Sequence, residues 1–258
     1  MDGDLAGAAR GLLRSRTVVL LALANLALGI GTSAAMLGLL DVLVFRSPAH
    51  VEDSGALRRI YITDTFPGMG DFTASETSCP VLRDLERARS FSALGAFFST
   101  RASLGRGADA RKVRAVLATP GFLRMLGVKP QLGRLFSDSE GFVALLSDDH
   151  WRRAFGRAPD VLGRQLKVGG DSFTIVGVLP GGFTGVDLEA ADLWLPMNAA
   201  GSFVGPGWST ERGDIYLEIV GRLQPETAPE AAAQEATALL RAGAADAGEP
   251  RPAARVSL

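Results

Sequence analysis

The chain contains one long, almost continuously apolar stretch, residues 17–46, and beyond it short apolar and polar runs alternate. No charged residue occurs between positions 17 and 40. About 24 uncharged residues form a helix of roughly 36 Å at 1.5 Å per residue, which exceeds the roughly 30 Å hydrocarbon core of a bilayer. The pattern therefore predicts a transmembrane helix over residues 17–46.

Two other interpretations of this stretch compete with a retained span. Three arginines that precede it could form the basic region of a signal peptide, and residues 33–35 are small enough for a cleavage site. The apolar run continues to Val44, past that site, which favours a retained helix. A buried helix of a soluble core is the second alternative, although such a helix rarely needs so long an apolar run.

The surface of the predicted helix favours contact with other helices. At 3.6 residues per turn, four small residues share one narrow face, where another backbone could approach closely: Ala27, Gly31, Ala34 and Gly38. Asn25 lies on the opposite face, and an amide in hydrocarbon needs a hydrogen-bonding partner. These five positions are the candidate helix-packing residues. The alternative is a lone anchor that happens to contain small residues.

The charges that flank the stretch predict its orientation. Arginines precede it at three positions, whereas only Arg46 follows at once, which favours a cytoplasmic N-terminus and an extracytoplasmic C-terminal region. Residues 1–16 have apolar residues at helical spacing and could form a cytoplasmic segment that lies on the membrane surface. A disordered basic tail is the alternative.

The region after the span has the pattern of a folded α+β domain. Strand-like runs are predicted at 57–62, 91–104, 111–118, 143–146, 165–168, 172–178, 191–196 and 214–223. Helices are predicted to begin at Ser78 and to occupy residues 121–126, 148–155 and 229–242. We expect a two-lobed arrangement: residues 47–127 and 213–245 form the two halves of a βα-type lobe, residues 128–212 form an inserted, mainly β lobe, and residues 246–258 form a flexible tail.

The composition narrows the classes of function. The net charge of −1 gives no field for nucleic-acid binding, and the single cysteine, Cys79, excludes an intrachain disulfide. The sequence has no G-x-x-x-x-G-K-[ST] loop, no G-x-S-x-G elbow and no Cys/His or H-E-x-x-H spacing for zinc. His150 follows Ser147-Asp148-Asp149 at a helix start that we expect to be solvated. We therefore predict no catalytic, cofactor-binding or metal-binding residues, and no enzyme.

An ordered series of motifs resembles the MacB/FtsX-like ABC-transporter permease family. The series is LALGIG at 26–31, LGVKP at 126–130, LGRLF at 132–136, WRRAFG at 151–156, TIVGVLP at 174–180 and ADLWLP at 191–196. Permeases of this family carry a large extracytoplasmic domain between the first two of four spans. Since this chain ends before a second span, the resemblance implies a permease truncated before its remaining transmembrane helices.

The resemblance also implies partners, a location and a mechanism. A separate cytoplasmic ATP-binding subunit would move the membrane helices, and the extracytoplasmic domain would relay that motion or contact a cargo or partner. The expected location is the bacterial inner membrane, with the lipid bilayer, other permease helices and a second copy of the chain as neighbours. Two alternatives stay open: a single-span membrane-anchored binding or sensor module, and an anchored hydrolase whose Ser, His and Asp residues the sequence does not connect.

Overall fold

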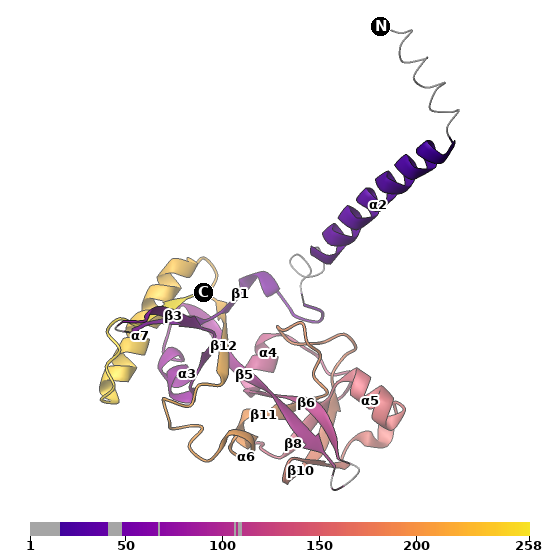
Figure 1. The fold of residues 1–258 in the computed structure, drawn as a ribbon. Coiled ribbons are helices and arrows are strands. Elements are labelled where there is room, and N and C mark those ends of the chain that lie inside the picture. Colours follow the sequence, from indigo (N-terminus) through magenta and orange to yellow (C-terminus); the bar gives the residue numbers. More distant parts are fainter. Residues whose placement is uncertain (1–15, 41–47, 67, 106, 108–109) are drawn as a thin grey trace. The chain divides into compact units, whose positions relative to one another are not determined.

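The computed structural model describes residues 16–40, 48–66, 68–105, 107 and 110–258. Its contacts group the chain into two compact units, Met1–Ser47 and Pro48–Leu258. In the first unit Arg16–Leu40 form one helix of 25 residues, α2 (Figure 1). The rest of the predicted surface segment 1–16, and residues 41–46 of the predicted span, lie outside the described residues.

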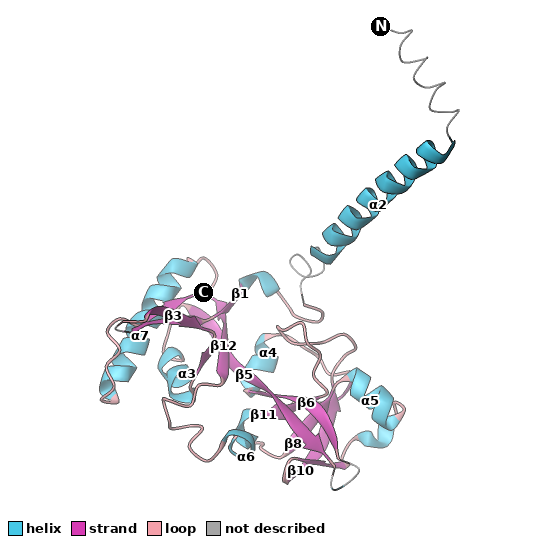
Figure 2. Ribbon diagram, in the orientation of Figure 1, coloured by secondary structure: helices cyan, strands magenta, loops and turns pink. Residues whose placement is uncertain are grey.

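The second unit is built on a large mixed sheet, so the chain is a helix–strand protein with one apolar N-terminal helix (Figure 2). The strand order is β1–β12–β5–β6–β11–β8–β10–β7, with β4 beside β12 and β9 beside β10 and β5. The strands are β1 (Leu57–Arg59), β4 (Glu76–Thr77), β5 (Phe91–Leu104), β6 (Arg111–Ala118), β7 (Leu132–Gly133), β8 (Val143–Leu146), β9 (Gln165–Val168), β10 (Asp171–Val178), β11 (Leu193–Pro196) and β12 (Leu217–Leu223).

A second, three-stranded sheet and several helices complete this unit. The small sheet has the order β13–β2–β3, with β13 (Arg255–Ser257), β2 (Tyr61–Phe66) and β3 (Gly70–Ala74). The α-helices are α3 (Cys79–Leu85), α4 (Pro120–Met125), α5 (Asp148–Phe155), α6 (Gly201–Val204) and α7 (Pro229–Asp246). Short 3₁₀ helices lie at Ser54–Ala56, Pro159–Val161 and Met197–Ala199.

Strand β5 joins the two ends of the large sheet. Residues from Phe91 to Phe97 pair with β12, and residues from Phe97 to Leu104 pair with β6 on the other edge. In Figure 1 this strand runs from the part with α3 and α7 to the part with α5. Both parts therefore share the backbone hydrogen bonds of one strand.

The core is tightly packed around Phe97, the residue of β5 at which the pairing partner changes from β12 to β6. Phe97 lies 4.9 Å from Phe122 between ring centroids, and Phe122 stacks on Trp194 at 6.3 Å. Helix α4 approaches β5 so closely that a Cβ at Gly95 would lie 2.5 Å from the Cα atom of Phe122. Glycine at position 95 is therefore a condition for this helix–strand contact, because interiors tolerate little added volume.

Residues 128–212, for which the sequence predicts an inserted lobe, continue the same sheet. They contribute β7 to β11 and α5, and β11 returns parallel to β6 with Leu193 opposite Ala115. Among the aromatic side chains of this region, Trp194 and Phe183 are buried, and Trp151 and Phe155 are partly buried against the core.

Most predicted elements form at or near their expected bounds, and two differ. The single strand expected at 57–62 is two strands, because β1 pairs with β12 whereas β2 pairs with β13 and β3. Residues 246–258, for which the sequence predicts a flexible tail, contain β13, in which Val256 lies opposite Ile62 of β2. Both differences depend on pairing between distant segments, which local patterns do not encode.

Candidate functional site

Helix α2 presents exposed apolar side chains along its length. Its Val19–Gly38 segment is long and apolar enough to cross a membrane, and none of that window is buried. The exposed side chains include Leu20, Leu23, Leu26, Leu28, Ile30 and Leu37, each more than half exposed. So much contiguous apolar surface requires lipid or protein neighbours.

The small residues of α2 leave room for another helix. A Cβ added at Gly31 or at Gly38 would meet nothing within 4 Å among the described residues, so neither glycine is required by packing inside the chain. A shallow groove along the helix is lined by Asn25, Ala34 and five further residues, Leu26, Gly29, Ile30, Ser33 and Leu37. The groove therefore includes two of the five predicted packing residues, and Ala27, Gly31 and Gly38 lie outside it.

The chain enters the second unit through residues 48–56, which we call the junction segment. The imidazole Nε2 of His50 lies 2.9 Å from the carbonyl oxygen of Gly181, and the Glu52 amide donates to the Leu126 carbonyl at 2.9 Å. A Cβ at Gly127, whose φ is +71°, would lie 2.4 Å from the Glu52 side chain. The junction segment is therefore fixed against the end of α4.

One arginine of β12 holds this segment in place. The Arg222 guanidinium donates to the carbonyl oxygens of Glu52 at 2.5 Å, of Asp53 at 2.9 Å and of Met125 at 2.9 Å, and to the Asp53 carboxylate at 3.1 Å. In the sheet register Arg222 lies opposite Leu57 of β1 on one side and opposite Ala93 of β5 on the other. A planar guanidinium with several donors is suited to bridging such acceptors. We call this set of contacts the Arg222 clamp.

A second charged cluster gathers side chains from β1, β12 and β6 with the loop residue Asp187. Arg59 pairs with Glu218 and, at 2.7 Å, with Asp187, and Arg114 lies 3.9 Å from the Asp187 carboxylate. The Arg59 guanidinium also lies 5.7 Å from the centroid of Phe97. Burial raises the pKa of the Glu218 carboxyl, although the charge of Arg59 opposes that shift. This cluster adds ionic contacts close to Phe97, where β5 changes its pairing partner.

The sequence does not identify Arg222 as a residue that fixes the junction segment, because the contacts of Arg222 depend on the register of β12 against β1. The one available signal is an arginine at a polar position of a strand-like run, residues 214–223, in which apolar and polar residues alternate.

Two residues with reactive side chains, Cys79 and His150, are buried in the described part of the chain. No group of three or more His, Cys, Asp or Glu there could hold a metal ion. Cys79 is buried, and burial raises the pKa of its thiol, which disfavours the reactive thiolate. The expectation for His150 was wrong: its ring is buried and not solvated, with Nδ1 3.5 Å from Asp192, and burial lowers its pKa.

Comparison with known proteins agrees with this architecture. The family model described as MacB-like periplasmic core domain matches residues 19–239. No curated protein matches the sequence.

Two solved structures share the fold. The extracellular domain of the noncanonic ABC-type transporter YknZ from Gram-positive bacteria aligns with a TM-score of 0.59 at 15% identity, covering 78% of this chain and 100% of that domain. The periplasmic region of MacB from Actinobacillus actinomycetemcomitans aligns with a TM-score of 0.56 at 13% identity, covering 80% of this chain and 92% of that region. At these identities the likeness is one of fold. Because the family model extends over most of the sequence, the chain belongs to the family of the MacB-like periplasmic core domain.

Proposed function

We propose that this chain is a permease-type component of an ABC transporter, with α2 in the membrane and residues 48–258 outside the cytoplasm. The observation that carries the proposal is the uncovered apolar surface of α2 on a chain of this family. A membrane removes that surface from water at a gain of about 25 cal/mol per Å². The arginines that precede α2 support a cytoplasmic N-terminus at the bacterial inner membrane.

The small face of α2 supports contact with other transmembrane helices. Ala27, Gly31, Ala34 and Gly38 would allow a close approach of backbones, and Asn25 would find its hydrogen-bonding partner on a neighbouring helix. The neighbours proposed are other helices of a permease, with a second copy of this chain among the candidates. ATP hydrolysis belongs to a separate subunit, since the sequence has no P-loop motif.

The role proposed for residues 48–258 is to relay motion of the membrane helices, or to contact a cargo or partner. A relay needs a stiff connection between the chain leaving the membrane helix and the body of the domain. The Arg222 clamp supplies such a connection for the junction segment, and β5 supplies one within the large sheet. No covalent chemistry is required of this chain.

The helix-packing claim predicts the effect of bulk on the small face. Gly31→Leu combined with Gly38→Leu should abolish chemical crosslinking between this chain and other membrane proteins in native membranes, because the added side chains separate the backbones. Ala35→Leu, a similar gain in bulk at a position outside both the small face and the groove, should preserve the crosslinks. Crosslinks that survive the double substitution would contradict the small face, and a wild-type chain without membrane partners would favour the single-span sensor module.

The orientation predicts which positions a membrane-impermeant maleimide can reach. Leu188 is 73% exposed, so Leu188→Cys should be labelled in intact spheroplasts. Leu5→Cys, in the basic N-terminal segment, should be labelled only after lysis. The wild-type chain is the control, because its one cysteine is buried. Labelling of Leu5→Cys but not of Leu188→Cys before lysis would reverse the proposed orientation.

The Arg222 clamp predicts a local loosening when the guanidinium is removed. Arg222→Met keeps an apolar stem but loses the donors, and should lower the free energy of unfolding of the full chain in detergent by about 2–3 kcal/mol. Hydrogen exchange of the Glu52 amide should become faster. Arg87→Met, at an exposed arginine, should change neither quantity. Equal behaviour of the two variants would show that the clamp does not hold the junction segment.

A further inference from the structure

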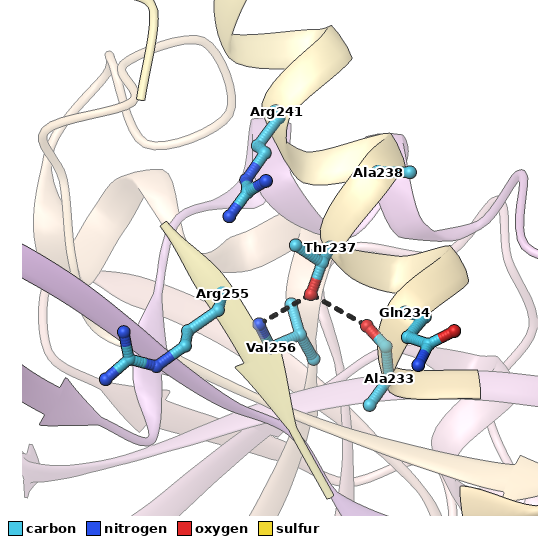
Figure 3. Close-up of a pocket in the computed structure, with 7 residues that line it drawn as sticks. All are labelled: Ala233, Gln234, Thr237, Ala238, Arg241, Arg255 and Val256. Carbon is cyan, nitrogen blue, oxygen red and sulfur yellow. Dashed lines mark hydrogen bonds between the residues drawn. The ribbon is translucent and has the colours of Figure 1, made fainter. Parts of the chain in front are cut away.

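The three-stranded sheet β13–β2–β3 has two edges, and only one of them is covered. At the β13 edge, the Val256 amide donates to the hydroxyl of Thr237 on α7 at 2.8 Å, and that hydroxyl donates to Ala233 at 2.7 Å (Figure 3). The Arg241 guanidinium donates to the Ala254 carbonyl at 2.7 Å. Helix α7 therefore satisfies backbone groups at this edge, as proteins commonly do to prevent unwanted pairing.

The opposite edge, β3, is open. Within the described residues β3 pairs only with β2, and Gly70, Asp71, Phe72 and Thr73 are all exposed. An antiparallel strand directs alternate N–H and C=O groups away from its one neighbour. Such a row of backbone groups is a template for one kind of ligand, an extended polypeptide segment.

Apolar side chains gather beside this open edge. Phe66 is 43% exposed, Phe72 63% and Ile215 63%, and all three line one small hollow beneath the β2–β3 hairpin. Met69, in the turn between the two strands, is 83% exposed. Exposed apolar side chains that cluster in this way are typical of an interaction surface.

The size and charge of the hollow limit what can occupy it. Its volume of about 120 Å³ is far below the roughly 300–1,000 Å³ of small-molecule sites and is suited to one apolar side chain. The two arginines in its wall already have partners, since Arg251 pairs with Asp64 and Arg212 pairs with Asp84 at 2.8 Å. The hollow therefore offers apolar contact and no unpaired cation for an anionic ligand.

The two faces of β3 differ in chemistry, which defines the ligand further. Phe72 lies opposite Asp64 on the side of the hollow, whereas Thr73 lies on the other face, where its hydroxyl is 2.7 Å from that of Thr63. A strand added next to β3 would meet an apolar face in alternation with a polar face, which carries the hydroxyl of Thr73 and the carboxylate of Asp71, already paired with Arg255. An added strand in which apolar side chains alternate with Thr or Ser would match both faces.

From these observations we infer that the β3 edge is a docking site for an extended segment of another protein. The segment adds a fourth strand to the β13–β2–β3 sheet, has alternating apolar and hydroxyl side chains, and inserts one apolar side chain into the hollow beside Phe72. The backbone edge supplies affinity and the hollow supplies selectivity. This surface lies within the second unit, Pro48–Leu258, and the inference does not depend on the transport role proposed above.

The test uses a phage-displayed library of random ten-residue peptides, panned on the full chain in lipid nanodiscs. We expect enriched sequences that alternate apolar and hydroxyl residues. The most enriched peptide, once synthesised, should bind Phe72→Ser at least about tenfold more weakly than wild type, as the loss of one buried apolar contact implies. Leu188→Ser, which removes a similarly exposed apolar side chain elsewhere, should bind as wild type does.

Hydrogen exchange and crosslinking complete the test. Bound peptide should slow the exchange of the β3 amides, a result that loss of folding in a variant could not produce. The inference is overturned if no peptide is enriched, or if Phe72→Ser and Leu188→Ser bind the peptide equally. Disulfide crosslinking between two copies of Thr73→Cys would instead show that a second copy of this chain covers the edge, which also overturns it.

Discussion

Strand β5 changes its pairing partner from β12 to β6 at Phe97, and the rest of the domain depends on this shared strand. One continuous strand pairs with β12 over its first half and with β6 over its second half, so rotation of one part of the sheet against the other would have to bend this strand or break its backbone hydrogen bonds. Side chains reinforce this constraint from the sheet surface. Phe97 is buried against Phe122, the Arg59 guanidinium lies over its ring, and Gly95 lets α4 approach the strand. Residues 48–258 form one compact unit, and we expect it to behave as one body with two ends.

This arrangement explains how a membrane protein could use the domain without chemistry of its own. The junction segment is held by Arg222, whose strand is the partner of the first half of β5. A displacement applied at residues 48–56 would therefore act on the central sheet directly. In the family to which the chain belongs, the domain is defined as periplasmic. A stiff body attached to an apolar helix fits the relay role proposed above.

Local patterns in the sequence were sufficient for most elements and insufficient for their pairing. The apolar run of α2 and the acidic start of α5 each act within a few residues. The partners of β5, the division of residues 57–66 between two sheets and the pairing of β13 depend on contacts between distant segments. Arg222 and the buried His150 were missed for the same reason, since their surroundings come from other strands.

The central claim, that residues 48–258 form one rigid body, can be tested by pulsed electron paramagnetic resonance on the full chain. Spin labels at Ala238→Cys on α7 and Arg152→Cys on α5, both exposed positions, report the distance between the two ends of the domain. The native Cys79 is buried and should not react with the label. The account predicts one narrow distance distribution that is the same in detergent and in lipid nanodiscs. Two populations, or a broad distribution that shifts between these conditions, would show that the two ends move independently and would contradict it.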